Sequence, residues 1–304
     1  MSVSTLNTVA AGVRPSRAVR RRRALQRIRD VIGLVPFFVY VGIFFIAPTL
    51  QVVVLAFQDQ DGAWTLGNIQ EAATGVYRDG FIQSLKLAAL SALTGTAAGF
   101  AAAYALIKTN NKTLQRVYQT ASGVFANTGG VPLAFLFIAT VGTYGLFTQF
   151  LLWLGIDIYA GSWTLFQFSG LLLVYLYFQI PLMVIVILPA LEAQKVAWRE
   201  AATNLGATTR QYWTLVGGPI LFAPTAGAFL LLFANAFAAY ATASALTSGT
   251  IPLVPLQIAA LLAGNVIADR QNLGYALGFG MILNVAVAMY IYNWTQKRAA
   301  KWLQ

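Results

Sequence analysis

The chain has 304 residues, of which 58% are hydrophobic and 10% are charged, with a net charge of +11 and a mean hydropathy of +0.68. Soluble domains carry about a quarter charged residues, so this composition indicates a membrane protein that crosses the bilayer several times. Cysteine and histidine are both absent, which excludes thiolate chemistry, iron–sulfur ligation and disulfides and removes the commonest ligands and bases of zinc, haem and triad sites.

Residues 1–30 form a polar, basic tail that contains eight arginines between Arg14 and Arg29. We expect a solvated cytoplasmic tail that fixes the topology and touches anionic lipid, since no aromatic or fold signal of a nucleic-acid-binding arm accompanies it. The next run, 31–57, holds 27 uncharged residues. That is too long for a signal-peptide core and long enough to cross about 30 Å of hydrocarbon, so it is the expected first transmembrane helix.

Five more apolar runs are long enough to cross a membrane, at residues 81–107, 129–152, 164–190, 216–246 and 273–294. The expected fold class is therefore an all-α integral membrane protein with six transmembrane helices, five of them in a core at 80–296. With the N-terminus inside the cell, six crossings place the C-terminal tail, 297–304, inside as well.

The distribution of positive charge agrees with this orientation. The segments expected inside hold 17 of the 20 Lys and Arg residues, and only Arg78, Lys86 and Arg270 fall elsewhere. Besides the arginines of the tail, the inside set consists of Lys108, Lys112, Arg116, Lys195, Arg199, Arg210, Lys297, Arg298 and Lys301. This bias follows the positive-inside rule and accounts for the net charge without a nucleic-acid partner.

No Asp or Glu lies within the six expected spans. Proton-coupled carriers and ion pumps usually keep such a carboxylate as a relay, and intramembrane aspartyl proteases need two, so both classes are disfavoured. The chain also lacks a Gly-x-x-x-x-Gly-Lys-Ser/Thr phosphate loop and contains no Gly-Lys pair. A transporter of this composition must be passive or be driven by a separate subunit.

Small residues recur at helical spacing in the second and sixth spans, at Ser91, Gly95, Gly99 and Ala103, and at Gly274 and Gly278. Such faces predict close helix packing. The segments 129–132 and 179–181 contain Gly or Pro and are expected to interrupt their helices, which at membrane depth requires hydrogen-bond partners from protein or a water-filled cavity.

Four polar residues are expected near the middle of the bilayer: Gln179, Asn235, Tyr240 and Asn284. Each could hydrogen-bond a neighbouring helix, or the four could line a path for a solute. The sequence leaves both alternatives open.

A helical hairpin is predicted in the inside loop at 192–215. Gly206 suits the left-handed residue that ends a first helix, and Thr208 with Gln211 has the form of a capping box that opens a second. The face at positions i, i+3, i+4 and i+7 of the first helix consists of Trp198, Ala201, Ala202 and Leu205. An apolar face in a connecting loop has to be covered, either by the ends of this protein's own helices or by another protein.

The hairpin carries a family resemblance. Glu200-Ala201-Ala202, three residues, Gly206, nine residues and then Val216-Gly217-Gly218-Pro219 resembles the motif Glu-Ala-Ala-x3-Gly-x9-Ile-x-Leu-Pro, called EAA, of binding-protein-dependent ABC importer permeases of type I. The spacing is met in full, while Val216 and Gly218 replace the Ile and Leu of the motif. The resemblance covers roughly residues 80–300, and 31–57 corresponds to an extra N-terminal helix.

The resemblance implies a multi-pass permease in a bacterial cytoplasmic (inner) membrane, with both termini inside. It implies pairing with a second permease subunit, binding of two ATPase subunits and delivery of solute by an external solute-binding protein. ATP and magnesium would be held by the ATPase subunits, with no cofactor or metal in this chain. The residues expected to couple the permease to an ATPase are Trp198, Glu200, Ala201, Ala202, Leu205, Gly206 and Arg210.

The local sequences at 84–87, 130–134 and 233–240 are most similar to those of permeases of the spermidine/putrescine branch. Systems of that branch usually employ two different permease chains. Permeases for phosphonate, thiamine, ferric iron or oxyanions are the alternatives within the family. Outside it, a stand-alone secondary transporter or facilitator and a membrane scaffold remain, whereas an enzyme is disfavoured because no nucleophile with a base and no metal cluster occurs in the spans.

Overall fold

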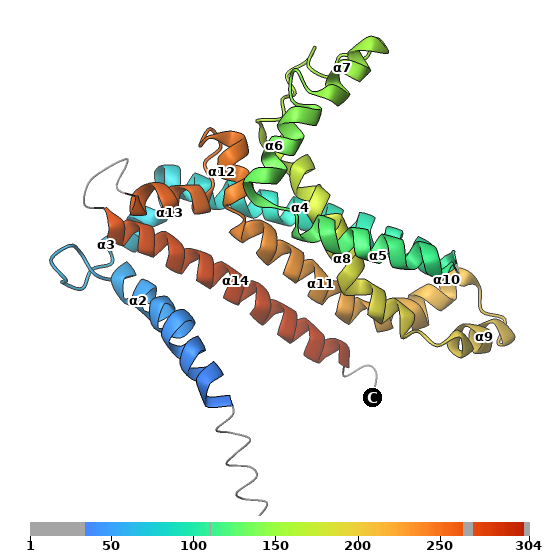
Figure 1. The fold of residues 1–304 in the computed structure, drawn as a ribbon. Coiled ribbons are helices and arrows are strands. Elements are labelled where there is room, and N and C mark those ends of the chain that lie inside the picture. The colour runs from blue at the N-terminus through green and yellow to red at the C-terminus, as the bar shows by residue number, and fades with distance from the viewer. Residues whose placement is uncertain (1–33, 110, 264–269, 301–304) are drawn as a thin grey trace, which may run out of the picture. The chain divides into compact units, whose positions relative to one another are not determined.

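The structure is a computed structural model that describes residues 34–109, 111–263 and 270–300. All regular elements in these ranges are helices (Figure 1). The basic tail 1–30 and residues 301–304 lie outside the described ranges.

Six helical segments are long and apolar enough to cross a membrane in the described ranges. They are Leu34–Ala56, Gly75–Lys108, Gly130–Trp153, Phe168–Glu192, Thr209–Ala238 and Gln271–Trp294. The protein is therefore an all-helical, multi-pass membrane protein.

The chain divides into two compact units, one ending at Val54 and one beginning at Leu55. The described part of the first unit is helical and contains a π-helical turn, η1 (Gly42–Ile46). Its large apolar side chains, such as Phe37 and Phe44, are exposed. Apolar side chains exposed on a long helix are typical of contact with lipid.

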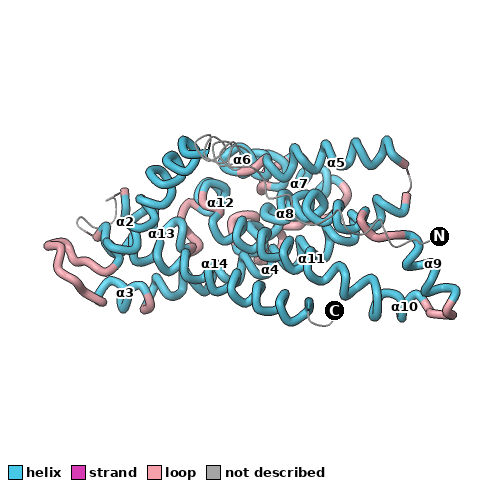
Figure 2. Tube along the Cα trace, turned by 90° about the horizontal axis from the view of Figure 1, so that it is seen from below, coloured by secondary structure: helices cyan, strands magenta, loops and turns pink. Residues whose placement is uncertain are grey.

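The second unit begins at the end of α2 (Ala47–Ala56) and contains the remaining elements. In chain order they are α3 (Gly67–Ala72), α4 (Gly75–Lys108), α5 (Lys112–Asn127), α6 (Gly130–Val141), α7 (Leu146–Trp153), α8 (Phe168–Glu192), α9 (Val196–Asn204), α10 (Thr209–Tyr212), the π-helical turn η2 (Trp213–Gly217), α11 (Gly218–Ala238), α12 (Ala241–Thr247), α13 (Val254–Leu262) and α14 (Gln271–Ala300). Within this unit, α9 and α10 lie at the opposite end from α3 and α13 (Figures 1 and 2).

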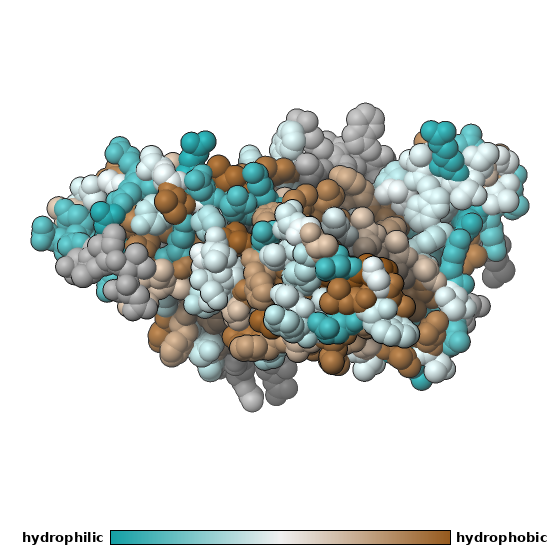
Figure 3. All heavy atoms as spheres, turned by 90° about the horizontal axis from the view of Figure 1, so that it is seen from above, coloured by the Kyte–Doolittle hydropathy of each residue, from teal (hydrophilic) through white to brown (hydrophobic). Residues whose placement is uncertain are grey.

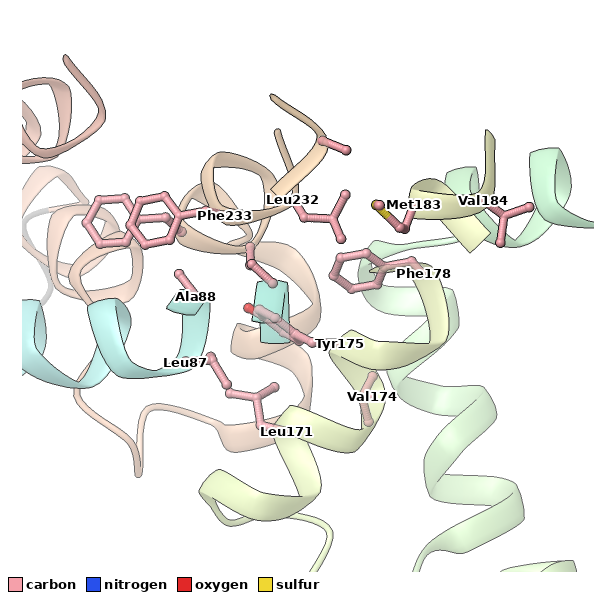
Figure 4. Close-up of a cluster of buried hydrophobic side chains, with 14 of the residues drawn as sticks. Leu87, Ala88, Leu171, Val174, Tyr175, Phe178, Met183, Val184, Leu232 and Phe233 are labelled. Atoms are coloured by element: carbon pink, nitrogen blue, oxygen red, sulfur yellow. The ribbon is translucent and has the colours of Figure 1, made fainter. Parts of the chain in front are cut away.

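The core of the second unit forms where α4, α8 and α11 pack together. Figure 4 shows Leu87 and Ala88 of α4, Tyr175 of α8 and Leu232 of α11 in this buried cluster. The small face of α4 permits the close approach, because a Cβ added at Gly99 would lie 2.5 Å from the Cβ of Met183. The packing role expected for Ser91, Gly95, Gly99 and Ala103 is confirmed, and all four are buried.

Polar side chains in the second unit gather toward its two ends. Figure 3 shows hydrophilic residues at both ends of the visible face and mostly hydrophobic residues between them. A second, smaller apolar cluster joins α3, α13 and α14 at one end, with Leu273, Ala276 and Leu277 of α14 buried in it. This banding is the pattern expected for a bundle that crosses a hydrocarbon layer.

Several helix boundaries differ from those expected. The run 129–152 is divided into α6 and α7 by a turn at residues 142–145, and α11 ends at Ala238 instead of continuing to 246. The interruption expected at 129–132 is present, since α5 ends at Asn127 and α6 begins at Gly130. The interruption expected at 179–181 is absent: α8 runs through Pro181, as membrane helices can when neighbouring helices support them.

Candidate functional site

The helical hairpin is held in shape by its own backbone. Gly206 adopts a left-handed conformation with a φ of +76°. Its N–H donates to the carbonyl of Thr203 at 2.9 Å, and the N–H of Ala207 donates to the carbonyl of Ala202 at 3.0 Å. These two bonds form a Schellman motif, which satisfies the last carbonyls of α9 and confirms the role expected of the glycine.

The second helix of the hairpin begins with the expected capping box. The N–H of Gln211 donates to the Thr208 hydroxyl at 3.3 Å, and the N–H of Thr208 donates to the Gln211 side-chain oxygen at 2.7 Å. Because both helix ends are satisfied within the hairpin, the turn between α9 and α10 needs no support from the rest of the chain.

The apolar face of the hairpin is left uncovered by the described residues. No residue of α9 is buried. Trp198 is 37% exposed, and Leu205, next to the turn, is 87% exposed. Of the two alternatives, the described part of the chain does not show the hairpin packed on its own helix ends.

Neither of the two charged residues expected at the hairpin, Glu200 and Arg210, has a structural role within it. Glu200 lies in the second turn of α9, not in its first, so it does not cap the helix. Glu200 and Arg210 are both exposed, and the one salt bridge among the described residues, between Arg270 and Glu71, involves neither. Both side chains are available to a partner.

An aromatic joint connects the hairpin to the membrane helices. The ring of Trp213 packs edge-on against Tyr104 of α4, with centroids 5.4 Å apart, and against Tyr212, with centroids 5.7 Å apart. The Gln194 side chain donates to the carbonyl of Gly217 at 3.4 Å, which ties the end of α8 to the same joint. The joint therefore connects the hairpin to α4, to the end of α8 and to the start of α11.

The joint contains the π-helical turn η2. The N–H of Gly218 donates to the carbonyl of Trp213, five residues earlier, and a Cβ added at Gly218 would lie 2.4 Å from that oxygen. The turn thus accepts glycine at the position where the EAA motif carries leucine. Turns of this kind occur frequently at functional sites.

The four polar residues expected in mid-membrane fall into separate groups. Asn235 and Tyr240 line one cavity of about 380 Å³. Gln179 is fully buried, and its amide donates to the carbonyl of Leu232 at 2.9 Å. The amide of Asn284 donates to the carbonyl of Gly280 in its own helix at 2.8 Å. The structure thus brings two of the four together at a cavity.

This cavity, here called the break cavity, lies between two interruptions of the bundle. One separates α5 from α6 and the other separates α11 from α12. Its lining residues are Ala126, Asn127, Gly129, Gly130, Phe178, Asn235, Ala238, Ala239, Tyr240, Ala241 and Thr242. None of these lining residues is charged.

Two hydroxyl groups satisfy the backbone at the interruptions. The N–H of Gly130 donates to the Thr242 hydroxyl at 2.8 Å, and that hydroxyl in turn donates to the carbonyl of Gly130 at 3.3 Å. The Tyr175 hydroxyl donates to the carbonyl of Ala239 at 3.0 Å. Irregular backbone at membrane depth is tolerated where protein supplies such partners or where it borders a water-filled cavity.

The opposite end of the second unit carries a polar network that the sequence did not indicate. Arg270 forms a salt bridge with Glu71. The Asn272 amide donates to the carbonyls of Gln58 and Asp59, at 2.9 and 2.8 Å. A cavity of about 620 Å³ lies beside the salt bridge and is lined partly by α13. The residues involved are more than 150 positions apart, so no local pattern could have revealed the network.

Comparisons with known proteins give the fold. No protein-family profile matches the chain, and no curated protein sequence matches it. A solved bacterial ABC transporter involved in the import of the acidic polysaccharide alginate matches with a TM-score of 0.69 and 20% identity, over 93% of this chain and 99% of that one. The bacterial alginate ABC transporter, solved in complex with a periplasmic protein bound to alginate pentasaccharide, matches with a TM-score of 0.72 and 19% identity, over 91% of this chain and 96% of that one. The chain has the fold of ABC importer permeases.

Proposed function

We propose that the chain is the permease subunit of an ATP-driven ABC importer and that the helical hairpin is where the ATPase subunit docks. The observation that carries this proposal is the pairing of a self-supported hairpin with an uncovered apolar face, at Trp198 and Leu205. The EAA resemblance falls on the same residues. Small side chains at Ala201 and Ala202 let a second protein approach the helix closely, while Glu200 and Arg210 supply charges for polar contacts at the rim.

The proposed mechanism places ATP hydrolysis in separate subunits. Two ATPase subunits, with ATP and magnesium, close beneath this chain and a second permease and move their hairpins. The aromatic joint around Trp213 passes that motion to α4 and α11. Because α11 ends at the break cavity, the displacement reaches the place where Asn235 and Tyr240 are exposed to a solute.

The proposal includes an orientation and the partners. The hairpin end of the second unit faces the cytoplasm of a bacterial cell, as do both termini, and the end that carries α3 and α13 faces outward. The charge bias of the sequence supports this orientation. An external solute-binding protein would meet the outward end, where the salt bridge between Arg270 and Glu71 lies.

The solute is inferred to be a small polar molecule. The sequence resemblance favours a polyamine such as spermidine or putrescine, with phosphonate, thiamine, ferric iron and oxyanions as alternatives. The similar structures come from importers of an acidic polysaccharide. Competition of spermidine uptake by a phosphonate, thiamine, ferric iron, an oxyanion and short acidic oligosaccharides, each in turn, separates these candidates.

The function is tested with the complex purified from its own membrane and reconstituted in liposomes. We expect ATPase chains and a second permease to co-purify, and solute uptake to require ATP on the hairpin side together with the binding protein. Uptake driven by a solute or proton gradient with no ATPase chain present would instead identify a secondary carrier. The absence of both uptake and ATPase stimulation would identify a scaffold.

A further inference from the structure

The helix α5 (Lys112–Asn127) was not expected from the sequence. It packs beside α8 in the second unit (Figures 1 and 2). The ring of Phe125, near its end, lies 5.4 Å from the ring of Tyr177 in α8. The 16 residues of α5 rise about 24 Å, close to the rise of about 23 Å between Tyr177 and the end of α8 at Glu192. The helix therefore covers the half of α8 that faces the hairpin end.

The surface of α5 is divided into three faces. One packs on the bundle through Gln115, Tyr118, Ser122 and Phe125, with Ser122 buried and the Gln115 amide donating to the carbonyl of Leu106 at 3.3 Å. A second face is apolar and exposed, with Val117 61% and Val124 59% accessible. The third, here called the polar stripe, consists of Lys112, Arg116, Gln119, Gly123 and Asn127, which follow one another at helical spacing.

The polar stripe leads from the hairpin end to the break cavity. Lys112 is the first residue of α5, and Asn127, the last, is part of the cavity lining. Lys112, Arg116, Gln119 and Asn127 are exposed, and Gly123 is half-buried. Polar side chains at membrane depth usually face a water-filled cavity or the interior of the protein, because exposure to hydrocarbon is costly. The apolar face with Val117 and Val124 is the part of α5 suited to lipid.

We propose that the polar stripe of α5 forms one wall of the solute path between the break cavity and the hairpin end, and that Lys112 and Arg116 make this half of the path favour anionic over cationic solutes. The inference rests on the proposed function, which places the hairpin end in the cytoplasm. Neither cation takes part in the salt bridge found among the described residues. A polycation leaving along this wall would pass two like charges at the exit, whereas an anion would be attracted to them. Among the solutes named above, the stripe therefore favours the anionic alternatives, phosphonate and oxyanions, over a polyamine.

Cysteine accessibility tests the wall directly, because the native chain contains no cysteine. Gln119→Cys and Asn127→Cys place a thiol on the stripe, and Val117→Cys and Val124→Cys are matched controls on the other exposed face of the same helix. Each variant of the assembled transporter is labelled with membrane-impermeant methanethiosulfonate reagents in inside-out vesicles. We expect the stripe positions to react at least about tenfold faster than the valine positions, since the reactive thiolate is disfavoured in apolar surroundings.

The charge preference is measured on the same helix. At Gln119→Cys, one turn from Arg116, the anionic sulfonatoethyl reagent is compared with the cationic trimethylammonium-ethyl reagent. Adding Arg116→Gln should lower the ratio of anionic to cationic labelling rates by about threefold, as expected for one nearby, partly screened charge. Lys195→Gln, which removes an exposed cation at the start of α9, should leave the ratio unchanged.

The outcomes separate this inference from the proposed function, because labelling needs neither ATP nor the transported solute. Equal labelling of stripe and valine positions in a transporter that shows ATP-dependent uptake would overturn the wall and leave the function intact. A ratio unaffected by Arg116→Gln would overturn the charge preference. Selective labelling of the stripe in a chain that transports without an ATPase would support the wall and contradict the proposed function.

Discussion

At the scale of single residues, Gly206 can be compared directly with Gly155. Both are left-handed, with φ of +76° and +80°, and a Cβ added at either would meet nothing within 4 Å. Gly206 forms the turn of the hairpin, whereas Gly155 lies after α7. A substitution at either position therefore adds the same backbone strain without a clash, and the two differ only in what the turn does.

Gly206→Leu should uncouple ATP hydrolysis from uptake. A non-glycine residue in the left-handed conformation costs about 1–2 kcal/mol. We expect this strain to open the Schellman turn and to displace the face that carries Leu205. We expect uptake per ATP hydrolysed to fall severalfold in liposomes while the protein still inserts into the membrane. Gly155→Leu is the matched control and should stay coupled. A fully coupled complex with Gly206→Leu would contradict the docking role of the hairpin.

The mid-membrane polar residues should separate into packing and path residues. Gln179→Ala leaves the carbonyl of Leu232 without its side-chain donor and should destabilise the bundle by about 1–3 kcal/mol, measured as a lower melting temperature in detergent. Asn235→Ala and Tyr240→Phe should leave the melting temperature unchanged and raise the apparent KM for uptake. Asn284→Ala, whose amide bonds within its own helix, should alter neither. Unchanged uptake kinetics for Asn235 and Tyr240 variants would remove the break cavity from the path.

At the scale of elements, the joint between the hairpin and α11 depends on Trp213. Its ring contacts Tyr104 in α4, and it is the first residue of η2, the turn that leads into α11. A hairpin that could bind its partner but not displace α4 and α11 would no longer reach the break cavity. Binding of the ATPase and transmission of its motion are thus separable.

Trp213→Ala should retain binding of the ATPase but lose transmission. The ring is half-buried, so the loss of packing should cost about 2 kcal/mol locally. We expect an unchanged dissociation constant for the ATPase subunit, together with ATP hydrolysis no longer stimulated by loaded binding protein. Trp213→Phe keeps an aromatic edge against Tyr104 and should restore most of the stimulation. Weakened ATPase binding in Trp213→Ala would place the residue in the docking surface instead.

Some elements could be predicted from the sequence because their signals are local. The hairpin followed from Gly206, from Thr208 with Gln211, and from the apolar spacing of the first helix that precedes Gly206, and its cap and turn are confirmed. The helix α5 has no long apolar run that would mark it as a span, because its polar stripe lowers its hydropathy. Asn111 carried the missing signal: its side chain accepts from the N–H groups of Thr113 and Leu114 and caps the start of α5.

At the scale of the molecule, the number of spans and the helical class follow from composition and run length, and the structure agrees. The positions at which those spans are broken or continuous do not follow from composition and run length. The separation of α11 from α12 has no glycine or proline at Ala239 or Tyr240. It is supported by the Tyr175 hydroxyl, which donates to the carbonyl of Ala239 from a distant part of the chain. The opposite difference occurs at Pro181, where an interruption was expected but the surrounding helices keep α8 continuous. Both differences arise from tertiary contacts that no window of sequence contains.

The π-helical turn η2 has one more consequence. A π turn contains an additional residue compared with an α turn, so it is equivalent to a one-residue insertion in a helix. In a regular helix each residue advances the azimuth by about 100°. The insertion therefore sets the azimuth of α10 about the axis of α11. Deleting one residue there would rotate the exposed Trp198 and Leu205 toward a different neighbour, although the surface that they present would itself be unchanged.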